Sequence, residues 1–267
     1  MDMEEYWGLK EPPFENVPDP RFFYAAPQHE EALTRLIYAA SRRKGAAMLT
    51  GDVGCGKTLL SRVFIQGLSS DRYEVALIVN PVMNPLDLIR EVIYQFGIKN
   101  KYSSKTQLLR LLNTELAKNL QRQKDSVIIV DEAQAIRDLN TFEELRLLLN
   151  FQLNDRFLCT LILFGQPELL NVVRKIPQLE QRIAIKYHIR PFNLEETLSY
   201  INIRLRKAGT ERMLLSEKAM QIIHQYSQGV PRKINNLCDL ALLVGFSSKV
   251  KVVDESLILR IIDDGRG

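Results

Sequence analysis

The chain has 267 residues, of which 46% are hydrophobic and 25% are charged. These proportions are typical of a soluble globular protein with one sizeable core, or one core and a small second domain. Its net charge of +4 is spread along the chain, so it permits an anionic partner without requiring one. Three cysteines without a CxxC pair argue against a disulfide framework or a zinc site. Because no signal peptide and no apolar run of about 18 residues is visible, we expect a cytoplasmic protein that does not span a membrane.

The first segment, residues 1–28, is an arm rich in proline and aromatic residues. Its prolines interrupt regular structure, so we expect an irregular arm whose aromatic side chains pack on the core of the main domain. Two interpretations of its role stay open. Part of the arm borders an adenine ring, or the arm only covers an edge of the core.

Residues 29–43 carry apolar side chains at helical spacing and predict a helix. The basic triplet Arg42-Arg43-Lys44 ends it, where cations suit the negative end of the helix dipole. A solvated helix terminus is one interpretation of this triplet, and a contact with nucleic acid is the other.

A phosphate-binding loop follows the apolar run at 46–49. Its eight residues match G-x-x-x-x-G-K-[ST], a pattern that holds phosphates when a strand enters it and a helix leaves it. The glycines let backbone N–H groups face the phosphates, and the helix start adds its own N–H groups and positive dipole end. Lys57 is suited to neutralise phosphate oxygens, and the Thr58 hydroxyl is suited to bind Mg²⁺. The predicted nucleotide-binding residues here are Gly51, Asp52, Val53, Gly54, Cys55, Gly56, Lys57, Thr58 and Leu59.

Apolar strands alternate with helices as far as residue 190. After the loop, strands are predicted at 74–79, 126–130, 159–164 and 183–189. Helices are predicted at about 85–96, 105–122 and 141–152, and from 167 to about 174. This alternation predicts an α/β domain over residues 29–190, with a five-stranded parallel sheet that is covered by helices on both faces.

From residue 191 the alternation of strands and helices stops. Helical patterns with recognisable start and stop residues cover 195–208, 216–228, 231–246 and 254–262. Residues 191–267 therefore predict a small all-helical domain.

An acidic pair, Asp131-Glu132, follows the third predicted strand. At the carboxyl end of a parallel strand, Asp131 would lie at the ligand-binding edge of the sheet and hold Mg²⁺. Glu132 would polarise the attacking water. Such a pair is common by itself, but together with the phosphate loop it predicts ATP as the ligand and its hydrolysis as the reaction.

Four longer motifs carry a resemblance to a known family. They are the aromatic and proline residues from Tyr6 to Phe22, Asp131-Glu132-Ala133-Gln134, the run FGQPEL at 164–169 and the run GVPRKIN at 229–235. With them, nearly the whole chain resembles an AAA+ ATPase, a P-loop NTPase. Among these proteins it is similar to the ExeA/GspA-type secretion ATPases and the shorter MshM-type pilus-biogenesis ATPases. The aromatic and proline arm separates this group from other AAA+ proteins.

The resemblance implies roles for four further residues. Gln166 matches sensor 1, which lies between the acidic motif and the γ-phosphate. Arg182 matches the arginine finger that reaches the nucleotide of a neighbouring subunit. Arg232 matches sensor 2, which folds the helical domain onto the phosphates as a lid. Asn80 matches a polar residue that restrains the catalytic glutamate.

Plainer alternatives stay open for several of these residues. Gln166 could cap the following helix. Arg182 could be an ordinary surface cation, as could the nearby Arg174 or Lys175. Cys55 has no family role, and a small residue tolerated at a variable position is favoured over a redox switch.

The resemblance also implies a biological role. We expect hydrolysis of Mg-ATP by a homo-oligomer, a hexameric ring, that supports assembly of a secretion or type IV pilus-like apparatus. Its partners would be inner-membrane assembly proteins, and the chain would be cytoplasmic or peripheral at that membrane. The longer relatives continue into a membrane span and a peptidoglycan-binding domain. The chain is then either the short form or the ATPase portion of a longer protein, in which case residues 263–267 begin a linker.

Two other functions stay open. An ATP-dependent, DNA-binding regulator of transposition, similar to TnsC, fits the basic excess and the triplet at 42–44, although a helix-turn-helix appendage and a clustered basic stripe are missing from the sequence. A nucleotide-dependent switch that works by assembly alone is disfavoured by the intact Glu132 and the candidate finger.

Overall fold

The computed structural model describes residues 2–265. Arg266 and Gly267, the end of the expected linker start, lie outside the described residues. The described chain forms two compact units. The sheet unit comprises Pro27–Asp52 and Leu60–Ile189, and the helical unit comprises residues 2–26, 53–59 and 190–265.

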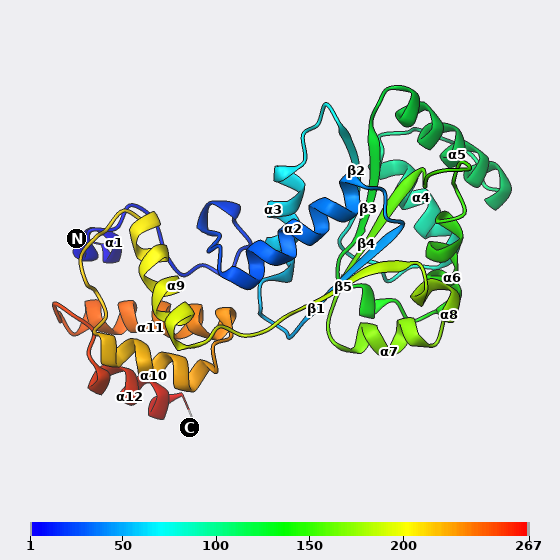
Figure 1. Ribbon diagram of the computed structural model, residues 1–267. Coiled ribbons are helices and arrows are strands. Elements are labelled where there is room, and N and C mark those ends of the chain that lie inside the picture. Colours follow the sequence, from blue (N-terminus) through cyan, green and yellow to red (C-terminus); the bar gives the residue numbers. More distant parts are fainter. Residues whose placement is uncertain (1, 266–267) are drawn as a thin grey trace. The chain divides into compact units, whose positions relative to one another are not determined.

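The sheet unit contains the predicted five-stranded parallel sheet (Figure 1). Its strands run in the order β2-β3-β4-β1-β5. The central strands β1, β3 and β4 are buried along their whole length, as their unbroken apolar sequences indicate, whereas β5 alternates between buried and exposed side chains because it forms an edge. The strand bounds are β1 (Ala46–Gly51), β2 (Tyr73–Ile78), β3 (Asp125–Val130), β4 (Cys159–Gly165) and β5 (Ile183–Ile189).

Helices cover both faces of this sheet, as the alternating pattern predicts (Figure 1). Helix α2 (Pro27–Ser41) contacts β1, β3, β4 and β5, and α3 (Lys57–Gly67) lies on the same side of the sheet. The opposite face carries α4 (Pro85–Gln95), α5 (Lys105–Gln121), α6 (Leu139–Leu148), α7 (Glu168–Arg174) and α8 (Pro177–Glu180). The fold class expected from the sequence is confirmed.

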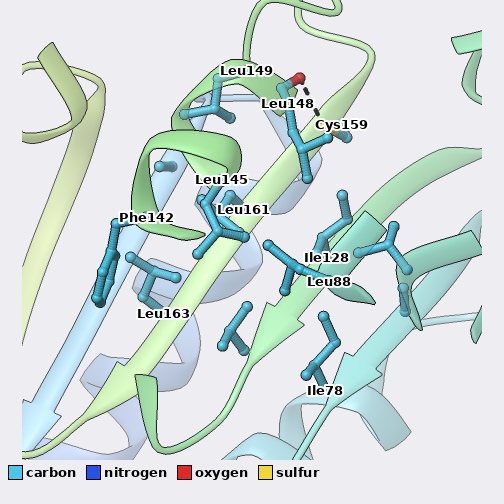
Figure 2. Packing of buried hydrophobic residues seen from close by; sticks show 14 of the residues in the cluster. Ile78, Leu88, Ile128, Phe142, Leu145, Leu148, Leu149, Cys159, Leu161 and Leu163 are labelled. Carbon is cyan, nitrogen blue, oxygen red and sulfur yellow. Dashed lines mark hydrogen bonds between the residues drawn. The ribbon is translucent and has the colours of Figure 1, made fainter. Parts of the chain in front are cut away.

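The core of the sheet unit lies between β1–β4 and the helices α4 to α8. Figure 2 shows Ile128 and Leu161 of the sheet packed against Leu88 and Leu145 of the helices. Fully burying one such aliphatic side chain is worth about 1.5–3 kcal/mol, so burial of this cluster stabilises the unit.

The helical unit is built from four longer helices, and three of them begin at a residue whose side chain caps the helix. The Asn193 side chain and Glu196 form a reciprocal capping box, and Ser216 and Asp254 each accept a backbone N–H at their helix start. The helices are α9 (Leu194–Lys207), α10 (Glu217–Ser227), α11 (Pro231–Ser247) and α12 (Glu255–Asp264).

The aromatic and proline arm belongs to the helical unit, where its side chains share one apolar cluster with α9 to α12. Trp7 is fully buried, and its indole Nε1 donates a hydrogen bond to the carbonyl of Leu242 in α11 (3.0 Å). The arm is also more regular than expected. Helix α1 (Met3–Trp7) forms before the first proline, with Asp2 as its cap, and a 3₁₀ turn, η1 (Pro20–Phe22), follows the Pro18-Asp19-Pro20 run.

Within residues 2–265, no helix combines the length and the hydropathy that a membrane span requires.

Candidate nucleotide-binding site

The phosphate loop has the strand-loop-helix context that its sequence requires. Strand β1 ends at Gly51 and α3 begins at Lys57. Gly54 and Gly56 both adopt left-handed backbone conformations, with φ of 85° and 86°, which non-glycine residues rarely adopt. Alternation of right- and left-handed residues turns successive N–H groups toward a common centre, the arrangement that binds phosphate. Lys57, at the start of α3, is buried.

Arg232 lies next to this loop in the helical unit. Its backbone N–H donates a hydrogen bond to the carbonyl of Gly54 (3.2 Å), and its side chain is exposed. A Cβ atom added at Gly54 would lie 2.9 Å from Cβ of Arg232 and 3.0 Å from Cγ1 of Val230. The loop is therefore too closely packed against the start of α11 for any residue but glycine at this position.

Three of the sequence motifs reach the same edge of the sheet unit. In the sheet order, β4 lies between β3 and β1, and all three strands are parallel. Leu163 is in register with Val130, and Gly165 with Thr50. The residues that directly follow these strands, Asp131 and Gln166, therefore lie at the carboxyl edge where Gly51 begins the phosphate loop. This is the edge where parallel α/β sheets bind ligands.

Glu132 has an unusual backbone at this edge. Its φ of 50° and ψ of 39° place a glutamate in the left-handed region, which costs about 1–2 kcal/mol for a residue with a side chain. Its N–H is held by the Asp131 carboxylate (2.9 Å), and its carbonyl accepts the N–H of Ala135 (2.8 Å) in the 3₁₀ turn η2 (Ala133–Ala135). Strained conformations that the surroundings enforce are concentrated at functional sites.

The Glu132 carboxylate is held by two side-chain amides. Oε2 of Glu132 accepts a hydrogen bond from Nε2 of Gln134 (2.5 Å) and a longer one from Nε2 of Gln166 (3.4 Å). Oε1 of Gln134 in turn accepts the backbone N–H of Gln166 (2.9 Å). The acidic motif and the candidate sensor after β4 thus form one hydrogen-bonded cluster within the sheet unit.

Asp131 and Thr58 have the oxygen chemistry that Mg²⁺ requires. Mg²⁺ takes oxygen ligands in octahedral geometry and is usually held by one or two protein groups, with the substrate phosphates and waters completing the set. The Asp131 side chain is buried (2% exposed) directly after β3, and its N–H continues the sheet by donating to Ile78 (2.8 Å). Thr58 is the second residue of α3. Each of these side chains, taken by itself, is an oxygen donor of the kind that Mg²⁺ binds.

Two of the residues singled out by resemblance, Asn80 and Arg182, are not among the side chains that hydrogen-bond to Glu132. Asn80 follows β2 and is exposed, and its Oδ1 accepts the N–H of Val82 (3.4 Å). Arg182 precedes β5 and is half-buried, and its Nη1 has no hydrogen-bond partner within residues 2–265. The carbonyl of Arg182 accepts the N–H of Ala46 at the start of β1 (3.2 Å). Arg182 therefore lies at the amino edge of the sheet, opposite the edge where Gly51 begins the phosphate loop.

Gln134 is the residue of this cluster to which the sequence alone assigns no role. It appears there only as the last residue of the Asp131–Gln134 motif. The signal that could have identified it is its type. A side chain with both a donor and an acceptor, two residues after a catalytic carboxylate, is suited to bridge that carboxylate to a backbone N–H.

Comparison with known proteins identifies the family. Residues 40–173, half of the chain, match the family described as an AAA domain. The chain belongs to the AAA domain family. It is also similar to "General secretion pathway protein A" of Aeromonas hydrophila, with 37% identity over 246 residues. That alignment covers 91% of this chain and 45% of the relative, so the chain spans less than half of the relative's length. The resemblance on which the sequence expectations rest is confirmed.

Solved structures show the same fold at low identity. The Aeropyrum pernix ORC2 protein in its ADPNP-ADP complexes has a TM-score of 0.70 at 17% identity, over 95% of this chain and 71% of that one. Drosophila ORC bound to DNA has a TM-score of 0.74 at 15% identity, over 99% and 66%. The RuvB Holliday junction branch migration motor of Thermotoga maritima has a TM-score of 0.57 at 16% identity, over 90% and 69%. The AAA domain with its phosphate loop makes this chain a nucleotide-binding protein.

Proposed function

We propose that this protein binds Mg-ATP and hydrolyses it to ADP and phosphate. The observation that carries the proposal is Glu132, a carboxylate placed at the ligand-binding edge of the sheet by a strained backbone and held there by two amides. A phosphate loop alone supports binding. A carboxylate held in a defined orientation at the sheet edge where that loop begins supports activation of water.

Each residue of the proposed site has a separate role in binding or hydrolysis. N–H groups of Gly51–Thr58 cradle the phosphates, and Lys57 neutralises their charge. Thr58 and Asp131 hold Mg²⁺, which when bound neutralises charge on the phosphate oxygens. Glu132 accepts a proton from the attacking water, and Gln166 fixes the direction of that carboxylate. Arg232, at the loop through its backbone, offers a cation from the helical unit.

We further propose that hydrolysis requires assembly. Arg182 lies at the opposite sheet edge from its own phosphate loop, so its guanidinium would serve a neighbouring subunit's nucleotide, in a ring that we expect to be hexameric. Its Nη1 is buried without a partner within the described residues, which is a costly arrangement for a cation and one that an anionic group of a neighbour would relieve. ATP turnover per chain should then rise with protein concentration and fall in Arg182→Ala.

The biological role we propose follows from similarity to General secretion pathway protein A. The chain would support assembly of a secretion or type IV pilus-like apparatus, as a cytoplasmic protein or one peripheral at the inner membrane. Because the chain spans less than half of that relative, this role is an inference about the shared part.

A DNA-binding function is the second candidate, and one feature favours it. Arg42, Arg43, Lys44 and Arg156 line a surface cavity of about 870 Å³ at the end of α2. Asp125 pairs with Arg43 and Asp155 with Arg156, so two of the four cations are already neutralised. A DNA mobility shift that requires ATP and weakens steeply with salt would support this function and count against the secretion role.

The decisive experiment compares two variants in binding and turnover assays. Lys57→Ala should lose nucleotide binding. Glu132→Gln should keep binding, hold ATP unhydrolysed and lose at least about 100-fold in turnover, the range expected for a general base. Hydrolysis by Glu132→Gln at the unsubstituted rate would refute the assignment of the base.

A further inference from the structure

We infer that Gln134 is a positioning residue that couples the carboxylate of Glu132 to the backbone at Gln166. The inference rests on the proposed hydrolysis, and it assigns to Gln134 the restraint on the glutamate that the resemblance assigns to Asn80. Gln134 reaches both groups at once, because Nε2 donates to Glu132 Oε2 (2.5 Å) while Oε1 accepts the Gln166 N–H (2.9 Å).

The chemistry of the two partners fixes the orientation of the Gln134 amide. A carboxylate oxygen only accepts hydrogen bonds, and a backbone N–H only donates. Rotating the amide by 180° would set oxygen against the Glu132 carboxylate and NH₂ against the Gln166 N–H. Both contacts would then be repulsive, so one orientation satisfies the bridge.

Space for this bridge depends on a glycine. A Cβ atom added at Gly165 would lie 2.8 Å from Oε1 of Gln134 and 2.7 Å from Cδ2 of Leu169, which is fully buried. The backbone of Gln134 is held as well, since it lies in the turn η2: the N–H groups of Ala135 and of the following Ile136 donate to the carbonyls of Glu132 and Ala133. Only the side chain of Gln134 is left to adjust.

The bridge makes the two ends of the cluster move together. Glu132 is in a strained left-handed conformation, so its carboxylate direction depends on the groups that hold it. A displacement of the Gln166 backbone would pull on Oε1 of Gln134 and release or redirect Oε2 of Glu132. Gln134 therefore couples the position of the backbone at Gln166, directly after β4, to the direction of the Glu132 carboxylate.

Two substitutions separate the two halves of the bridge. Gln134→Ala removes both hydrogen bonds. Gln134→Glu keeps an acceptor for the Gln166 N–H, loses the donor to Glu132 and sets a second carboxylate against it. The matched control is Gln95→Ala, which removes a similar Gln-to-Glu hydrogen bond (Gln95 Nε2 to Glu91 Oε1, 2.8 Å) on the exposed side of α4.

The experiment measures kcat and KM for ATP in the full chain, and amide hydrogen exchange at Gln166 in the nucleotide-free chain. Both Gln134 variants should lose about tenfold or more in kcat, with KM within about twofold, because the lost bond is to a charged group whose position matters during reaction. Gln166 exchange should accelerate about tenfold or more in Gln134→Ala and stay slow in Gln134→Glu. The control should change neither quantity.

The outcomes distinguish this inference from the proposed function. If the unsubstituted chain hydrolyses ATP and both Gln134 variants match it in kcat, the positioning role is refuted and the ATPase stands. If exchange at Gln166 is equally fast in both variants or unchanged in both, the bridge is refuted. If the unsubstituted chain binds ATP without turning it over, the proposed function fails. The exchange pattern then still decides whether Gln134 links Glu132 to Gln166.

Discussion

Replacing Gly229 by alanine tests how rigidly the helical unit holds the turn before Arg232. Gly229 has a φ of 73°, and its carbonyl accepts the N–H of Phe192 (2.9 Å). A Cβ atom there would lie 1.9 Å from the Phe192 carbonyl oxygen, a distance at which one backbone segment must move. Placing alanine in the left-handed region costs about 1–2 kcal/mol, and forcing an atom into a packed site costs about 1–3 kcal/mol. We therefore expect a loss of about 2–5 kcal/mol in the free energy of unfolding.

The chain provides its own probe for this measurement. It has one tryptophan, Trp7, which is fully buried in the same unit, so its fluorescence during urea unfolding reports on the helical unit. Two glycines of that unit separate the causes. Gly8 has a φ of 70° but only an ordinary contact at 3.6 Å, so Gly8→Ala should lose about 1–2 kcal/mol. Gly265 has neither a left-handed φ nor a close contact, so Gly265→Ala should stay within about 0.5 kcal/mol.

The order of the urea midpoints of the three variants tests whether the close contact at Gly229 causes the loss. If Gly229→Ala unfolds at the same urea concentration as Gly265→Ala, the turn yields freely and the close packing of Phe192 on Gly229 is not a constraint. If Gly8→Ala equals Gly229→Ala, backbone conformation alone accounts for the loss.

Two further predictions concern single ionic contacts. Lys105→Ala should lower the free energy of unfolding of the sheet unit by about 1–3 kcal/mol, because it leaves the buried Glu144 carboxylate (2% exposed) without the Lys105 ammonium that lies 2.5 Å away. Circular dichroism in urea would measure this loss, and an unchanged midpoint would contradict it. At the start of α12, hydrogen bonds from the Leu257 backbone and the Ser256 hydroxyl lower the pKa of Asp254 below 3.8. Since a lowered pKa stabilises the folded chain above pH 3.8 and this stability is lost as the pH falls through the lowered value, the unsubstituted chain should lose stability relative to Asp254→Asn in that acid range. A constant difference from about pH 7 to about pH 3 would refute the linkage.

The sequence predicts the sheet unit well because its strands are long apolar runs. A parallel strand buried on both faces has little room for polar residues, so β1, β3 and β4 stand out from their neighbours along the chain. Helix starts were also predictable where a residue such as Ser216 or Asp254 precedes an acidic first turn. Short elements were missed. Helix α8 has four residues, too few to show a period.

The partners of the arm were beyond the sequence for a different reason. An apolar residue indicates that its side chain will be buried, but it does not indicate the surface against which that side chain packs. Trp7 and Phe14 are in the same cluster as α9 to α12, which lie at the other end of the chain. The specific contacts are polar ones. Arg204 of α9 donates hydrogen bonds to the backbone carbonyls of Pro13 and Glu15, and no local pattern around either segment indicates such a pairing.

The candidate site shows the same limit at the scale of one side chain. The ends of strands can be predicted from the sequence, so Asp131 and Gln166 are expected at one edge of the sheet. Which polar side chain then restrains Glu132 depends on reach and on the direction of the backbone. Asn80 follows an edge strand that is adjacent to β3, and its Oδ1 accepts the N–H of Val82. Gln134 lies two residues after Glu132, which has a left-handed backbone, and its amide donates to the Glu132 carboxylate. The strained backbone of Glu132 and the bridging role of Gln134 are therefore one feature, and a sequence pattern that does not include φ predicts neither.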